Sequence, residues 1–144
     1  MRAGIAPIRT ATGGAAVRET IFYPLPHASS YGRGVALDLQ IQSPHYDNEE
    51  LGAVAVFDEA HDELTIFAVN RGQDGDLQLE GVLRDLESYG VVEHLVLEHA
   101  DPKAANTLAR PDVVTPHTRA DAALSQGRLA VTLPQLSWNV IRLS

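Results

Sequence analysis

Residues 53–70 read AVAVFDEAHDELTIFAVN and consist of two apolar runs separated by a short acidic connection. The runs, Ala53–Phe57 and Leu64–Val69, are rich in Val, Ile, Phe and Thr, whose branched or flat side chains pack well on a pleated surface. Two such runs joined by a few polar residues, here Asp58–Glu63, predict a β-hairpin.

The second run is apolar on both of its faces, because successive side chains of a strand point to opposite sides. A strand of this kind is covered on both faces, so we expect it to lie in the middle of a sheet. One face carries Leu64, Ile66 and Ala68, and the other carries Thr65, Phe67 and Val69.

The first 34 residues and the rest of the chain differ in hydrophobic period. Ile21, Leu25 and Ala28 have helical spacing, with Thr20 as a possible N-cap and Gly32 and Gly34 beyond the helix end. Pro24 is tolerated early in such a helix, whereas Pro26 is hard to place because it removes a second donor. Residues 4–8 form a short apolar piece, and residues 9–16 are loop-like with Gly13-Gly14 as the flexible point.

From Val35 onward the period is two, as in β-strands. Eight or so short strands with turn signals at near-regular spacing favour an antiparallel β-sandwich, jelly-roll-like, over a parallel α/β sheet. We expect residues 35–41 to form a strand with one wet face, and Pro116 to stop the brief strand 113–115. The other expected strands are 77–83, 89–98, 129–133 and 136–143, with loops at 43–48 and 70–76 and either a long polar loop or a short helical turn at 101–112.

The bulk composition is that of one ordinary soluble domain of 144 residues, with 44% hydrophobic and 21% charged residues. A net charge of −8 with scattered basic residues argues against nucleic-acid binding. No apolar run approaches the roughly 20 residues that span a bilayer, and the N-terminus lacks a secretory signal. With no cysteine in the chain, we expect a soluble cytoplasmic protein.

The densest group of histidine and acidic residues is a candidate metal site. It consists of Glu93, His94, Glu98, His99 and Asp101. Residues an odd number apart on a strand face opposite sides, so Glu93 diverges from Glu98 and His94 from His99. No spacing resembles a zinc signature. We therefore expect solvated strand-edge residues here, with no metal and no cofactor.

Catalytic carboxylates are also not indicated. Glu93 and Glu98 on one strand would lie about 16 Å apart, whereas glycosidases hold their two carboxyl groups about 5–9.5 Å apart. The pairs Glu49-Glu50 and Asp62-Glu63 lie in turn-like segments, where carboxylates mostly face water. Gly32-Arg33-Gly34 is too short for a phosphate cradle and fits a helix end.

Four aromatic residues are candidates for stacking on a sugar: Trp138, Tyr31, Tyr46 and Tyr89. Trp138 shares its strand parity with Leu136 and Val140 in a terminal apolar strand, so we expect a core role for it. The residues alone thus predict a β-domain without a catalytic site.

Several stretches resemble the C-terminal part of bacterial α-L-arabinofuranosidases of glycoside hydrolase family 51. The similarity runs in order through nearly the whole chain, although no single motif is specific alone. The matching stretches are IAPI at 5–8, TIFYP at 20–24, HAS at 27–29, YGRG at 31–34, LTIFAVNR at 64–71, VEH at 92–94, LEH at 97–99, LP at 133–134 and LSWNVIRL at 136–143.

The resemblance implies a catalytic α/β barrel followed by a jelly-roll β-sandwich. Residues 1–34 would then be the last strand, loop and helix of the barrel, and residues 35–144 the C-terminal sandwich. The family removes α-L-arabinofuranosyl groups from arabinan or arabinoxylan by a retaining mechanism, with two glutamates on earlier barrel strands. Those positions do not exist in this chain, so we expect no catalytic residue here and an inactive isolated chain.

The partners expected from the resemblance are the barrel portion of the same enzyme, arabinose-containing oligosaccharides through the full enzyme, and further copies in a homo-oligomer. Without the barrel, the helical remnant would expose Ile21, Phe22 and Leu25 and favour association. Two other readings stay open: a free-standing carbohydrate-binding module, and a structural subunit that completes a separately encoded barrel.

Overall fold

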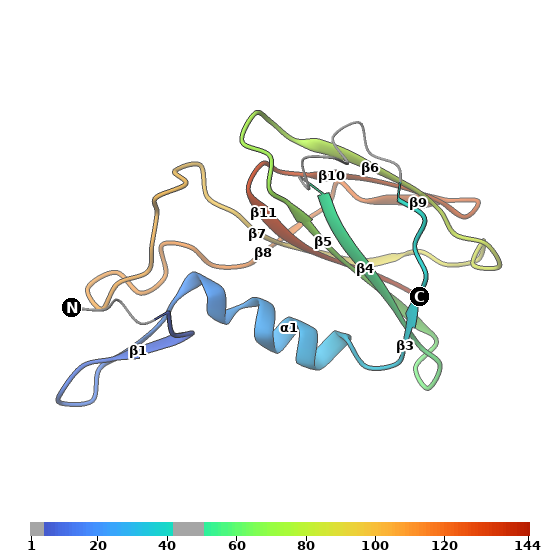
Figure 1. Ribbon diagram of the computed structural model, residues 1–144. Coiled ribbons are helices and arrows are strands. Elements are labelled where there is room, and N and C mark those ends of the chain that lie inside the picture. Colours follow the sequence, from blue (N-terminus) through green and yellow to red (C-terminus); the bar gives the residue numbers. More distant parts are fainter. Residues whose placement is uncertain (1–4, 42–50) are drawn as a thin grey trace.

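The structure, a computed structural model, describes residues 5–41 and 51–144. Within these residues a six-stranded sheet and a three-stranded sheet pack face to face, and one α-helix lies against the outer face of the larger sheet (Figure 1). A small two-stranded hairpin precedes the helix. None of the described helices has the length and apolar character needed to cross a bilayer.

All strand pairs in the three sheets are antiparallel. The larger sheet has the order β3 (Val35–Leu37), β4 (Leu51–Asp58), β5 (Glu63–Asn70), β11 (Ser137–Leu143), β7 (Val91–Leu97) and β8 (His117–Arg119). The smaller sheet has the order β6 (Leu77–Val82), β10 (Arg128–Leu133) and β9 (Ala123–Ser125). The N-terminal elements are β1 (Ile8–Thr10), β2 (Ala16–Arg18), the 3₁₀ turn η1 (Thr20–Phe22) and α1 (Pro24–Tyr31).

The predicted hairpin is confirmed as β4 and β5, and β5 lies inside the sheet between β4 and β11. Its two faces are covered as their parity predicts. Leu64, Ile66 and Ala68 are buried between the two sheets. Phe67, on the opposite face, is buried with Val140 beneath α1.

The main core fills the space between the sheets. It contains aliphatic side chains from β4, β5 and β11 of the larger sheet and from β10 of the smaller one. Full burial of a large aliphatic side chain stabilises the fold by about 1.5–3 kcal/mol. The buried set is Ala55, Leu64, Ile66, Ala68, Leu129, Val131, Leu133, Ile141 and Leu143. The predicted antiparallel sandwich is therefore present, while its jelly-roll character stays a prediction.

The helix is present, but its start differs from the prediction. Thr20 begins the separate turn η1, and α1 begins at Pro24 with Tyr23 at its N-cap. Pro26 is therefore in the first helical turn, where backbone N–H groups have no intrahelical acceptor, so neither proline disrupts the helix. Gly32 ends the helix as predicted, its N–H donating to the carbonyl of Ala28.

Two strand predictions are wrong: one strand is shorter than expected, and one does not form. The strand expected over 35–41 ends at Leu37, and β3 is exposed because it lies at the sheet edge. The strand expected over 113–115 does not form, because the Asn106 amide binds both the N–H and the carbonyl of Val114. The edge strand β8 instead begins after Pro116.

Besides the pairing of β8 with β7, two short pairings were not predicted. The loop-like segment 9–16 contributes to the hairpin of β1 and β2, whose turn places Gly13 at φ 102° and Gly14 at φ 100°. Such angles are open to glycine and costly for other residues. The strand β9 pairs with β10 over three residues, too few to give a clear period in the sequence.

Candidate functional site

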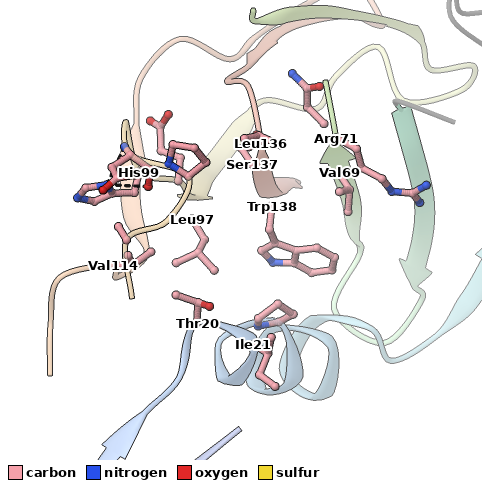
Figure 2. A pocket seen from close by; sticks show the side chains of 16 residues that line it. Thr20, Ile21, Val69, Arg71, Leu97, His99, Val114, Leu136, Ser137 and Trp138 are labelled. Carbon is pink, nitrogen blue, oxygen red and sulfur yellow. Dashed lines mark hydrogen bonds between the residues drawn. The ribbon is translucent and has the colours of Figure 1, made fainter. Parts of the chain in front are cut away.

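A cleft of about 440 Å³ lies between the N-terminal segment and the outer face of the larger sheet (Figure 2). Thr20, Ile21 and Pro24 form the wall at the start of α1. The other sides come from the sheet and from three loops. Those residues are Val69, Asn70, Arg71, Leu97, Glu98, His99, Asp101, Pro102, Ala104, Val114, Leu136, Ser137 and Trp138.

The floor of the cleft follows from strand register. Trp138 of β11 stands directly opposite Val69 of β5 on one side and Leu97 of β7 on the other. Residues paired across neighbouring strands share one face of the sheet. Three adjacent strands thus present one apolar side chain each at the same level, which makes a continuous apolar floor.

Trp138 is the central side chain of this floor, as Figure 2 shows. Its ring lies 5.7 Å from that of Phe67, and its indole N–H donates to Nδ1 of His27 over 3.2 Å. The side chain is half-buried and joins the two apolar clusters of the outer face, in partial agreement with its expected core role. Leu136 precedes β11 and has a φ of 49°, so it does not share the strand with Trp138.

The polar side chains at the cleft rim bond to their own surroundings. The Nδ1 atom of His99 accepts from the N–H of Asp101, whose carboxylate accepts from the N–H of Lys103. Glu98 pairs with Arg119 at 3.1 Å and with His117 at 3.4 Å. These carboxylates stabilise loops and strand ends.

The residues considered as a metal site in the sequence lie on different faces of the sheet and in the following loop. The expectation of solvated strand-edge residues is wrong for His94, which is buried on the inner face of β7, whereas Glu93 pairs with Arg142 on the outer face. Within 5–41 and 51–144, no three His, Asp or Glu side chains are placed to share a metal ion.

His94 is the centre of a buried polar network. Its Nδ1 lies 3.0 Å from a carboxylate oxygen of Asp121, and its Nε2 lies 3.1 Å from the side-chain oxygen of Asn139. Arg119 also donates to Asp121. Burial acts to raise the pKa of Asp121, but the hydrogen bonds from His94 and Arg119 outweigh it, so that pKa is lowered. The network fastens β7, β11 and the segment after β8 together.

Arg142 holds the acids of the outer face. It pairs with Glu63 of β5 and Glu93 of β7, and its guanidinium lies 4.4 Å from the centre of the Tyr31 ring. The hydrogen bond to Glu63 is the largest cause of the raised pKa of Arg142, and burial opposes it. Tyr31 therefore packs against a cation of the sheet and is not free to stack on a sugar.

The remaining candidates of the sequence are dispersed. Tyr89 donates to Asp62 in the turn before β5, and this hydrogen bond raises the pKa of Tyr89 to about 12. Tyr46 and the pair Glu49-Glu50 lie outside the described residues. The side chains that position the N-terminal segment, His27 and Asn106, carried no signal in the sequence because their partners are far away along the chain.

Comparison with known proteins agrees with this architecture. Residues 2–137 match the family model of the alpha-L-arabinofuranosidase C-terminal domain. The chain is 52% identical to an intracellular exo-alpha-(1->5)-L-arabinofuranosidase of Halalkalibacterium halodurans, over 96% of this chain and 29% of that protein. A protein of the same description, numbered 1, from Bacillus subtilis is 47% identical over 96% of this chain and 29% of its own length.

A solved structure gives the same result in three dimensions. The family 51 alpha-L-arabinofuranosidase of Bifidobacterium longum superposes with a TM-score of 0.85 and 32% identity, over 96% of this chain and 28% of that one. The helix-backed antiparallel sandwich is therefore the fold of the C-terminal portion of such glycosidases. The chain belongs to the family of alpha-L-arabinofuranosidase C-terminal domains. It spans less than a third of the length of the relatives named here.

Proposed function

We propose that this chain is the C-terminal part of a retaining α-L-arabinofuranosidase and is inactive without a catalytic α/β barrel. The observation that carries the proposal is the asymmetric coverage: 96% of this chain aligns with only 29% of an enzyme to which it is 52% identical. The aligned relatives are described as intracellular exo-acting enzymes, which supports a cytoplasmic location and action on arabinose-containing oligosaccharides.

Under this proposal the chain consists of two segments that belong to different domains of the enzyme. Residues 1–34 form the last strand, loop and helix of the barrel, and residues 35–144 form the sandwich that supports it. Barrel enzymes place their catalytic groups on loops at the C-terminal ends of strands around the whole ring. The described part of this segment, one short hairpin and one helix, is a small part of such a ring, so we assign the two catalytic glutamates to the barrel portion of the full enzyme.

The contacts of the N-terminal segment support its role as a fixed link between barrel and sandwich. Asn106 donates to the carbonyl of Arg18 at 3.0 Å, and Arg9 donates to the carbonyl of Asn106 at 3.3 Å. Tyr23 is buried with Leu97 and Val114 of the sandwich. A free-standing carbohydrate-binding module is not favoured, because the relatives named above are much longer enzymes.

The test is a complementation assay with an aryl α-L-arabinofuranoside. We expect the chain Met1–Ser144 alone to show no hydrolysis above buffer. Fused behind the upstream part of the Halalkalibacterium halodurans relative, it should restore activity that the upstream part alone lacks.

A control separates this result from a hidden active site in the sandwich. The fusion carrying Glu98→Gln should keep its activity, because the ion pairs of Glu98 within residues 5–41 and 51–144 are with His117 and Arg119 of the edge strand β8. Hydrolysis by the isolated chain that disappears on replacement of Glu93 or Glu98 would overturn the proposal. Light scattering on the active fusion would show whether it assembles as a homo-oligomer, which we also propose.

A further inference from the structure

The helix α1 lies along the outer face of the larger sheet (Figure 1), and two side-chain contacts fasten it there at two levels. Near its C-terminal end, the Tyr31 ring lies over the guanidinium of Arg142. One turn earlier, His27 Nδ1 accepts the indole N–H of Trp138 over 3.2 Å. Each of these two contacts joins residues 111 positions apart, and together they hold the helix above the apolar floor of the cleft.

The hydrogen bond between Trp138 and His27 fixes the protonation state of the imidazole. An indole nitrogen only donates, so Nδ1 of His27 has to accept and carries no hydrogen. The ring is therefore neutral, with its proton on Nε2. A second proton on Nδ1 would place two N–H groups against each other at 3.2 Å and replace the hydrogen bond by repulsion.

The charged and titratable groups around His27 come from each element packed against it. Tyr31 of α1 has its ring 6.4 Å from the imidazole. Glu93 of β7 is the acid that acts on His27, and it is itself paired with Arg142 of β11. Arg142 is further paired with Glu63 of β5. Because Glu93 is paired with Arg142, the cation offsets part of the support that this carboxylate gives to an imidazolium.

We propose that His27 is a protonation-controlled latch, which fastens α1 to the sheet through Trp138 when neutral and releases that part of the helix when charged. Release would uncover the Trp138 side of the cleft, since Pro24 and Ile21 of the adjoining segment form the facing wall. The latch is a property of the helix–sheet contact and does not rest on the enzymatic role proposed above.

The direction in which folding stability changes with pH follows from the difference in proton binding between the folded and the unfolded chain. Burial lowers the pKa of His27 from its ordinary 6.5, and Glu93 only partly opposes this effect. The unfolded chain then binds more protons than the folded one as pH falls past 6.5. The stability contributed by neutral His27 is therefore complete above that pH and is lost below it, down to the pKa of the folded state.

Trp138 reports directly on the latch because the chain has one tryptophan. We would titrate Met1–Ser144 from about pH 8 to about pH 5, the range in which histidines change charge, and record the fluorescence of the indole. The emission maximum should move to longer wavelength with a midpoint below 6.5 as the indole meets water. Far-UV circular dichroism over the same range should show that the sheets stay folded.

Two matched variants test the assignment. His27→Gln keeps an acceptor for the indole N–H and removes the titration, so its emission should stay constant over this range. His61→Gln removes an exposed histidine that pairs with Asp58, and its transition should match that of the original chain. A transition that persists unchanged in His27→Gln would overturn the proposal.

Nitrogen NMR of the imidazole provides a second readout that needs no variant. At neutral pH the His27 ring should be the Nε2–H tautomer, and its protonation should coincide with the change in fluorescence. A Nδ1–H tautomer, or protonation of His27 without any change in the Trp138 indole signals, would equally overturn the latch.

Discussion

At the scale of single residues, Asn106 shows how one uncharged side chain decides local structure. It is completely buried, and its amide donates to the carbonyls of Arg18 and Val114 and accepts from the N–H of Val114. It thereby ties the N-terminal segment to the loop before β8. The same bonds keep Val114 out of the sheet, which is why an apolar Val-Val-Thr run does not become a strand.

We expect Asn106→Ala to destabilise the chain by about 2–4 kcal/mol, because each buried backbone group left without a partner costs about 1–3 kcal/mol. Urea unfolding followed by circular dichroism measures the loss. Lys103→Ala in the same loop is the control and should change stability by less than about 0.5 kcal/mol, because its side chain is exposed. Equal stability of the two variants would show that the Asn106 bonds contribute nothing net.

At the scale of elements, the junction between α1 and β3 is set by a close backbone approach. Gly34 has a φ of 134°, and a Cβ atom at this position would lie 2.1 Å from the carbonyl oxygen of Phe57 in β4. The chain passes from the helix into the edge strand only because this residue has no side chain. The helix and the hairpin therefore meet at one sterically restricted point.

Gly34→Ala should lower the free energy of unfolding by at least about 2 kcal/mol, since both the positive φ and the clash oppose a side chain. Thermal unfolding is the measurement, with Gly90→Ala as the matched control because a Cβ there meets nothing within 4 Å. If the two variants melt at the same temperature, the junction is not restricted in the way described.

At the scale of the whole molecule, the two sides of the N-terminal segment differ. Phe22 was expected to be exposed, but it is half-buried beside Tyr23. Ile21 and Leu25 are exposed to 43% and 55%. Ile5 and Ile8 add to the exposed apolar surface of the same segment. The barrel in our proposal would cover this surface, and the isolated chain leaves it in water.

The double substitution Ile21→Thr and Leu25→Gln should therefore reduce concentration-dependent association of the isolated chain, because apolar patches drive such contacts. Light scattering over a concentration series gives the mass distribution. Val82→Thr removes a more exposed aliphatic side chain from β6 and should leave association unchanged. Association that falls equally in both variants would mean that general hydrophobicity, and not the N-terminal segment, is responsible.

The sequence by itself determined the hairpin of β4 and β5, the opposite faces of Leu64 and Phe67, and the sandwich class. These features follow from alternation between neighbouring residues, which is local information. It also determined the family through stretches spread over the whole chain. The cleft could not be predicted from the sequence. Its floor depends on which strands lie beside β11, and the alternation of residues does not specify strand order.

Only the tertiary structure decided how the N-terminal segment is held. The bonds of Asn106 to Arg18 and of Trp138 to His27 span 88 and 111 residues. Neither pair is close in sequence, and the hydrogen-bond partner of a buried amide or imidazole cannot be predicted from a periodic sequence pattern. Folding brings such groups together, and burial then makes their hydrogen bonds obligatory, because an unpaired polar group away from water is costly.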